Sequence, residues 1–172
     1  MRLLLVGLAL VCFSALGQGP ELTWITPPDA RLEVNGLPWY QENGGEWFRL
    51  PVKLKDSLPK EVWSLGQSPS GGRIRFRTDS SRLTIRLEYG SPPNMANMHA
   101  FGQTGVDVYV DGIYRATATA GKDAKAGAPT EFTYFDIQGG PRLERQITLY
   151  LPLYKPAKVL TIGVEKNARL SR

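Results

Sequence analysis

The strongest constraint on the fold is the shortness of the hydrophobic runs, which alternate apolar with polar residues over a few positions. Gly and Pro make up 18 and 13 of the 172 residues and separate these runs, at intervals typical of a sandwich or barrel. The best helix candidate, residues 60–65, is no more than a turn or two. We therefore predict an all-β fold, a jelly-roll-like β-sandwich of about ten short, mostly antiparallel strands. The expected strands are residues 22–26, 31–34, 46–50, 72–78, 82–89, 106–110, 113–119, 131–137, 146–151 and 159–164.

The first residues have the layout of a secretory signal peptide. Arg2 precedes an apolar run that ends in the small-x-small cleavage signal Ala15-Leu16-Gly17, as exported proteins require. The run is shorter than the roughly 20 apolar residues of a membrane-spanning helix. We therefore predict a signal peptide at 1–17, a single domain at 18–172 and a secreted or periplasmic location, without a membrane span. The only cysteine, Cys12, lies in the predicted signal peptide, so the mature domain would contain no disulfide.

The chain carries a mild excess of positive charge, +5 at pH 7, and nucleic-acid binding is not expected of an exported protein with so small an excess. Part of this charge lies in residues 72–78 and 82–89, where arginines alternate with apolar residues. Successive side chains of a strand point to opposite faces, so these runs predict a hairpin with one core face and one arginine-rich face. The arginine-rich face has two interpretations: a surface that binds anions or uronates, or a solvated face, open to water or covered by a neighbouring domain.

A second hairpin is expected around Asp111-Gly112, a dipeptide that favours a type I′ turn because both of its positions adopt positive φ. A two-residue turn places the valines of residues 106–110 on a core face and the polar and aromatic side chains on the opposite face. The register that follows pairs Val110 with Ile113, Tyr109 with Tyr114, Val108 with Arg115 and Asp107 with Ala116.

The candidate site consists of Asp107, Tyr109 and Tyr114, together with Asn97 and His99 from the segment before the strand. Because Asp is disfavoured in strands, Asp107 is either a hydrogen-bonding group on a binding or domain-contact face, or a carboxylate satisfied by an arginine or loop amides. The two tyrosines form either a stacking platform for a sugar ring or a cross-strand pair that stabilises the sheet. No second histidine or mature cysteine completes a metal site with His99, so neither a metal nor a cofactor is expected.

Short motifs in a recognisable order cover most of the chain. They are Trp47-Phe48-Arg49-Leu50-Pro51, Val62-Trp63-Ser64-Leu65, residues 70–79, Met98-His99-Ala100, residues 105–109 and Leu151-Pro152-Leu153-Tyr154. Together, over residues 46–164, they resemble the N-terminal, non-catalytic β-sandwich of secreted SGNH (GDSL-type) esterases. The Gly-x-Asp-Leu-Tyr signature of that family is matched at Gly105, Asp107 and Tyr109, with Val108 in the leucine position.

The resemblance implies a jelly-roll-like domain followed by an α/β SGNH domain that carries Ser-His-Asp chemistry. The sequence contains no Gly-Asp-Ser; the nearest string, Lys55-Asp56-Ser57-Leu58, lacks the glycine and continues into Pro59. No Asp stands three residues before His99, where the chain has Ala96. We therefore assign no catalytic residue to this chain. The expected partner is an SGNH catalytic domain, either downstream in the same protein or as an adjacent gene product.

Three functions remain to be weighed. The leading hypothesis is an accessory domain of an SGNH-type esterase, which assists substrate binding or supports the catalytic domain and is not catalytic alone. The alternative is a free-standing secreted carbohydrate-binding module, with a carbohydrate or a carbohydrate ester as its ligand. A third, a self-sufficient hydrolase that uses His99 and Asp107, is the least favoured because no credible nucleophile accompanies them.

Overall fold

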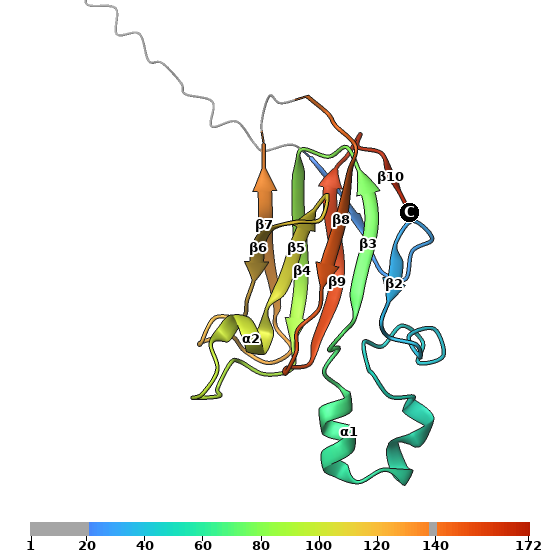
Figure 1. The fold of residues 1–172 in the computed structure, drawn as a ribbon, viewed down its shortest axis with the longest axis vertical. Helices are drawn as coiled ribbons and strands as arrows, with labels where there is room; N and C mark the ends of the chain where they lie inside the picture. The colour runs from blue at the N-terminus through green and yellow to red at the C-terminus, as the bar shows by residue number, and fades with distance from the viewer. Residues whose placement is uncertain (1–20, 138–140) are drawn as a thin grey trace, which may run out of the picture.

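The computed structural model describes residues 21–137 and 141–172, so the predicted signal peptide lies outside the described residues. Figure 1 shows long strands stacked in layers, with the short helices α1 and α2 near the lower end of the view. Within the described ranges, no helix is long and apolar enough to cross a membrane. The predicted all-β fold is confirmed.

The strands form two antiparallel sheets. One sheet has four strands in the order β1-β9-β4-β7, and the other has six, in the order β10-β3-β8-β5-β6, with β2 also paired to β3. The elements are β1 (Leu22–Ile25), β2 (Glu33–Asn35), η1 (Val52–Ser57), α1 (Lys60–Gly66), β3 (Arg73–Thr78), β4 (Arg82–Tyr89), α2 (Ala100–Thr104), β5 (Val106–Val110), β6 (Ile113–Ala118), β7 (Pro129–Asp136), β8 (Arg145–Tyr150), β9 (Ala157–Glu165) and β10 (Leu170–Ser171).

The core lies between the inner faces of the two sheets, and it follows directly from the alternation in the sequence. In β4, Leu83, Ile85 and Leu87 are at most 1% exposed, and Ile74 and Phe76 of β3 are equally buried. Burying a side chain of this size stabilises the fold by about 1.5–3 kcal/mol. The intervening polar positions therefore form the outer faces of the sandwich.

The predicted hairpin between β3 and β4 is wrong. β3 pairs with β8, β2 and β10, whereas β4 pairs with β7 and β9 in the other sheet. Alternation shows only that each strand has a core face, and two such faces can meet across a sandwich as well as lie side by side. The connection between them is buried at Asp79 and Ser80, and the Arg169 backbone N–H donates to Asp79 Oδ1 at 2.7 Å. The crossing between sheets is the jelly-roll-like feature of the topology.

The strand predicted at residues 46–50 is also absent from the described structure, where this segment has no strand partner. Arg49 instead bonds the end of α1: its backbone N–H donates to the Gly66 carbonyl at 2.9 Å, and its guanidinium donates to the carbonyls of Leu65 and Ser68. The short helix predicted at 60–65 is confirmed as α1. The composition of residues 46–50 therefore indicates a strand, but the backbone of Arg49 finds its hydrogen-bond partner at the end of α1 and not in a neighbouring strand.

The type I′ turn is confirmed, because Asp111 and Gly112 have φ values of 51° and 79°. Val110 pairs with Ile113 and Tyr109 with Tyr114 as predicted. Beyond them the predicted register is wrong, because a β-bulge shifts the pairing between Val108 and Tyr109. An extra residue on one strand is what such a bulge accommodates. The observed partners are Ala116 for Val108 and Thr117 for Asp107, and Arg115 is the additional residue.

Candidate functional site on the outer face of the six-stranded sheet

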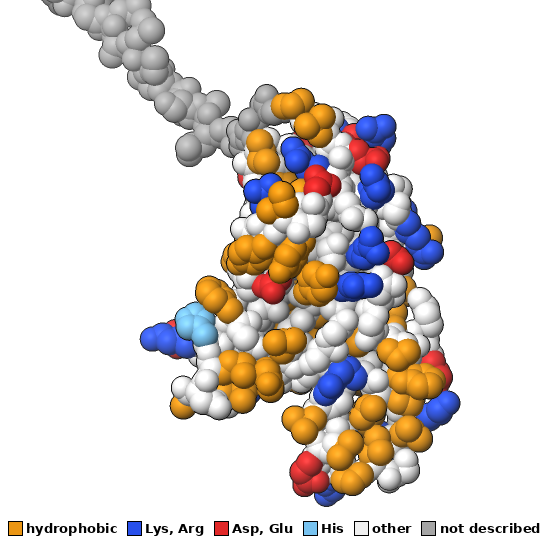
Figure 2. All heavy atoms as spheres, in the orientation of Figure 1, with side chains coloured by type: hydrophobic (Ala, Val, Ile, Leu, Met, Phe, Trp, Pro, Cys, Tyr) orange, Lys and Arg blue, Asp and Glu red, His pale blue; other side chains and the backbone are white. Residues whose placement is uncertain are grey.

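The structure brings Asp107, Tyr109 and Tyr114 together on the outer face of the six-stranded sheet. Strand β5 pairs with β6 on one side and with β8 on the other, so Asp107 lies between Thr117 and Tyr150. Figure 2 shows hydrophobic side chains gathered over β5, β6 and β8, and basic side chains along the side where β3 lies. The valines of β5 point the other way and are buried, as predicted.

Three tyrosines form a cluster at the centre of this face: Tyr109, Tyr114 and Tyr150, called here the tyrosine cluster. The ring of Tyr109 stands edge-on to Tyr114, with centroids 5.7 Å apart and an interplanar angle of 69°. It stands edge-on to Tyr150 as well, at 5.3 Å and 75°. Edge-to-face pairs at this separation are favourable beyond their buried area. Tyr114 and Tyr150 are still 52% and 39% exposed, so the cluster presents aromatic surface to solvent.

Asp107 is satisfied by a hydroxyl, and not by the arginine or loop amides considered from the sequence. The Thr117 hydroxyl donates to Asp107 Oδ1 at 2.5 Å. Because that donation uses the only hydroxyl hydrogen of Thr117, the Tyr114 hydroxyl must donate in turn to Thr117 Oγ1, at 2.8 Å. The Tyr114 ring is thereby fixed by the same carboxylate that stands beside it.

Asn97 and His99 lie apart from this cluster, on the loop before α2. Both side chains are exposed. His99 caps α2, since its Nδ1 accepts from the Phe101 backbone N–H at 3.5 Å, and the two rings lie 4.7 Å apart. Among the described residues, no hydrogen bond, ion pair or ring contact joins His99 to Asp107, so the pairing of an acid with a histidine base is not formed.

The loop is nevertheless held in place by a buried side chain, Gln103, which is 2% exposed. Its carbonyl oxygen accepts from the backbone N–H groups of Asn94 and Met95 at 2.9 and 3.0 Å. Its amide donates to the carbonyls of Met95 and Met98 at 3.1 and 2.7 Å. Such a fully satisfied buried amide fixes the backbone that carries Asn97 and His99.

Sequence reasoning missed Tyr150, Thr117 and Gln103. Tyr150 alternates with the core residues Ile147 and Leu149, so its outward direction could be read from the pattern. Its place beside Asp107 could not, because the pairing of β5 with β8 joins segments far apart in the chain. Gln103 lies in the short helix α2, and no local signal in the sequence marks it as buried.

The arginine-rich face is divided between the sheets. In β4, Arg86 donates from Nε to Glu131 at 2.9 Å and lies over the Trp24 ring, 3.7 Å from its centroid. In β3, Arg75 and Arg77 lie 4.0 and 3.1 Å from carboxylates of Glu33 and Glu144. Most of these arginines are thus paired with acidic residues of adjacent segments, as in a solvated sheet face.

The tryptophans do not add to the tyrosine cluster. Trp47 and Trp63 are buried, and Trp39 is 37% exposed. Trp24 is paired across β1 and β9 with Gly163, whose missing side chain leaves room for the ring. Three of the four tryptophans are therefore used for packing.

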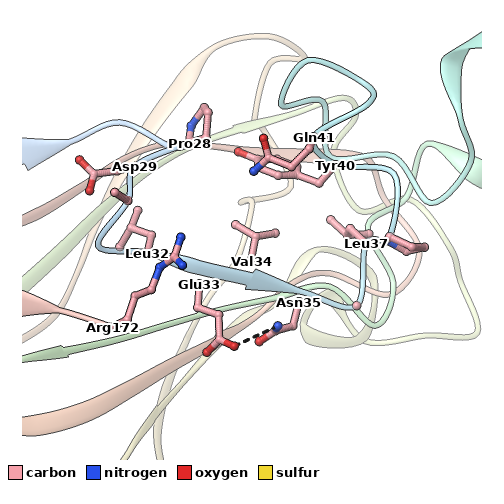
Figure 3. Close-up of a pocket in the computed structure, with 13 residues that line it drawn as sticks. Pro28, Asp29, Leu32, Glu33, Val34, Asn35, Leu37, Tyr40, Gln41 and Arg172 are labelled. Atoms are coloured by element: carbon pink, nitrogen blue, oxygen red, sulfur yellow. Dashed lines mark hydrogen bonds between the residues drawn. The ribbon is translucent and has the colours of Figure 1, made fainter.

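A separate cavity of about 550 Å³ lies beside β2 and is lined by residues 28–30, 32–38, 40, 41 and 172. Figure 3 shows Glu33 accepting from the Asn35 amide, a bond of 3.3 Å, at its edge. Asp29, also in the lining, is held by the Arg31 guanidinium at 2.7 Å, and this hydrogen bond lowers the pKa of Asp29 to about 2. The cavity contains none of the predicted site residues.

The described part of the chain shows no catalytic constellation around Ser57. The Ser57 hydroxyl donates to the Leu54 carbonyl at 2.9 Å within η1 and is exposed. Nor do residues 21–137 and 141–172 bring together three His, Cys, Asp or Glu side chains that could hold a metal ion. The outer face itself offers aromatic rings and a carboxylate that could stack on or hydrogen-bond to another molecule.

The fold and the site together define the class of protein: a two-sheet β-sandwich with a tyrosine-rich outer face. The family described as "GxDLY: N-terminus of Esterase_SGNH_hydro-type" matches residues 22–170. The chain belongs to this family, and the resemblance inferred from the motifs is confirmed. No curated protein matches the sequence.

Solved structures share this fold. A GDSL-like lipase from Bacteroides ovatus superposes with a TM-score of 0.72 at 25% identity, over 88% of this chain and 43% of that one. A salicylyl-acyltransferase from a tetracycline biosynthetic pathway gives 0.67 at 24% identity, over 88% and 41%. A family two carbohydrate esterase from Cellvibrio japonicus gives 0.51 at 10% identity, over 84% and 33%. The chain thus spans less than half the length of each of these proteins.

Proposed function

We propose that this chain is a non-catalytic accessory domain that supports an SGNH-type catalytic domain and helps it to bind substrate. The observation that carries the proposal is the family match over residues 22–170, on a chain that spans 43% of a GDSL-like lipase. The remaining part of such a protein provides the length for a catalytic domain. We further propose that residues 1–17 export the domain to a secreted or periplasmic location, leaving residues 18–172 as the mature unit.

Two parts of the described surface support distinct tasks in this proposal. Asp107, Tyr109 and Tyr114 combine one exposed ring, Tyr114, and one half-buried ring, Tyr109, with a fixed carboxylate, which suits substrate binding. Asn97 and His99 project from a loop whose backbone is held by Gln103, which suits contact with another domain because little conformational entropy is lost when a fixed loop binds.

The proposal is tested by measuring p-nitrophenyl acetate hydrolysis by the purified chain. No turnover above the buffer rate is expected, because Ser57 has no base within its hydrogen bonds. Ser57→Ala and the exposed control Ser64→Ala should behave alike. Turnover that is lost in Ser57→Ala and kept in Ser64→Ala would show that the chain is an enzyme.

The second candidate is a free-standing carbohydrate-binding module, favoured by the exposure of Tyr114 and Tyr150 in the tyrosine cluster. Self-association of the purified chain, measured by analytical ultracentrifugation, separates the two functions. A chain that binds polysaccharide and stays monomeric favours the module. Concentration-dependent self-association, with or without polysaccharide binding, favours the accessory domain, whose contact surface would then be exposed.

A further inference from the structure

Arg73 stands next to the tyrosine cluster on the same face of the sheet. In the pairing register, Tyr150 lies between Arg73 of β3 and Asp107 of β5, so the three form one row across neighbouring strands. Adjacent strands are about 4.8 Å apart. The row therefore places a guanidinium, an exposed aromatic ring and a carboxylate side by side over about 10 Å.

Arg73 differs from the other arginines of β3 in its partners. Arg75 and Arg77 each lie within 4.0 Å of a carboxylate, whereas no ion pair of Arg73 is found within residues 21–137 and 141–172. Its Nε is buried without a hydrogen-bond partner, as is the Oδ1 of Asn35, which pairs with it in the register. Only Nε is enclosed: the Arg73 side chain as a whole is half-buried, so its terminal nitrogens remain available to hold an anion.

We propose that this row binds an acidic polysaccharide, with a uronate carboxylate on Arg73 and a sugar ring on the tyrosine cluster. A guanidinium matches a carboxylate through two parallel hydrogen bonds. The C–H bonds of a sugar ring, which carry partial positive charge, pack against the negative face of an aromatic ring. Asp107 accepts hydrogen bonds from hydroxyl groups of the sugar. Because it lies two strands from Arg73 and repels a second carboxylate, the uronate carboxylate binds on the Arg73 side.

The chemistry of the row favours a polysaccharide over a protein partner. The core of a protein–protein interface is depleted in acidic residues, whereas here Asp107 stands directly beside the exposed ring of Tyr150. The inference rests on the proposed substrate-binding role and names the substrate class. It has a separate readout, because binding is measured without ester hydrolysis: a failure to bind leaves the hydrolysis test of the accessory role untouched.

The test is isothermal titration calorimetry of the whole chain with polygalacturonate, and with dextran as the neutral comparison. We expect polygalacturonate to bind and to weaken with added salt, which screens exposed charges, and dextran not to bind. Arg73→Gln and Tyr150→Ala should each weaken binding about tenfold or more. Arg86→Gln, which removes the same charge from the opposite sheet, and Tyr154→Ala, which removes an exposed tyrosine elsewhere, should bind as the parent does.

Circular dichroism confirms the fold of each variant. Should Tyr150→Ala unfold, Tyr114→Ala takes its place, since Tyr114 is the more exposed ring. Equal binding of dextran, no binding of polygalacturonate, or equal losses in Arg73→Gln and Arg86→Gln would each overturn the proposal. Self-association that Tyr150→Ala abolishes, without polysaccharide binding, would show instead that the face meets a protein.

Discussion

The side-chain amide of Gln103 donates a hydrogen bond of 2.7 Å to the carbonyl of Met98, from a position that is 2% exposed. This bond and three others from the same amide hold the loop that carries Asn97 and His99. Gln103→Ala leaves several backbone groups without partners, each at about 1–3 kcal/mol if it stays dry. We expect a loss of about 2 kcal/mol or more in the free energy of unfolding, measured by urea denaturation.

The exposed residue Asn97, on the same loop, gives the matched control. Asn97→Ala should change stability by no more than about 0.5 kcal/mol, and limited proteolysis should cut the loop faster in Gln103→Ala alone. Equal stability of the two variants would contradict the assignment of Gln103 as the anchor of the loop.

A second prediction concerns the packing of Trp24 on Gly163. A Cβ atom at Gly163 would lie 2.8 Å from Cζ3 of the Trp24 ring, and the Arg86 guanidinium lies 3.7 Å from the centroid of the same ring. Gly163→Ala should therefore displace the ring, shift tryptophan fluorescence and cost about 1–3 kcal/mol of stability, as overpacking does. Gly121→Ala, where no atom lies within 4 Å, serves as the control and should leave both quantities close to the parent values.

The connection between β3 and β4 makes the stability depend on pH. Burial raises the pKa of Asp79, but hydrogen bonds from the Arg169 backbone and side chain outweigh it, so that the pKa lies below its usual value. A carboxyl group with a lowered folded-state pKa adds stability above its unfolded pKa of about 3.9, and this stability is lost as the pH falls through the folded value.

We therefore expect Asp79→Asn to lower the thermal midpoint at pH 7 and to unfold with a shallower dependence on pH below about 4. Differential scanning calorimetry between pH 7 and pH 3 checks this. Parallel pH profiles for Asp79→Asn and the parent would show that the Asp79–Arg169 pair does not contribute.

Gly36 provides a fourth prediction, because its backbone has φ of 75° and a Cβ atom there would overlap the Gly71 carbonyl oxygen. Gly36→Ala should cost more than Gly44→Ala, whose φ of 68° is similar but whose Cβ would meet nothing within 4 Å. Left-handed backbone alone costs about 1–2 kcal/mol in a non-glycine residue. Equal unfolding free energies for the two variants, measured in urea, would contradict the close approach.

The sequence was sufficient for features that depend on local pattern. Nine of the ten strands predicted from alternation are present in the structure. The Asp111-Gly112 turn correctly predicted the pairing of Tyr109 with Tyr114. The sequence was insufficient where partners come from distant segments. The crossing of β3 and β4 between sheets, the β-bulge at Arg115 and the contact of Tyr109 with Tyr150 all depend on tertiary packing.

In the candidate site, too, local features could be predicted from the sequence, whereas contacts between distant segments could not. Local alternation placed Asp107, Tyr109 and Tyr114 on one face, because side chains of a strand alternate in direction. Alternation also placed Arg73 on an arginine-rich face, but it could not show that this face adjoins the site, because β8 lies between Arg73 and Asp107. His99 lies apart from that cluster, at the N-cap of α2.

The central claim is that the outer face of the six-stranded sheet is the binding surface of this domain. It is tested most directly by following the ¹H–¹⁵N NMR spectrum of the chain as polygalacturonate is added. The account predicts chemical-shift changes concentrated in β3, β5, β6 and β8, around Arg73 and Tyr150. Changes confined to β4, β7 and β9 of the other sheet, or no changes at all, would contradict it.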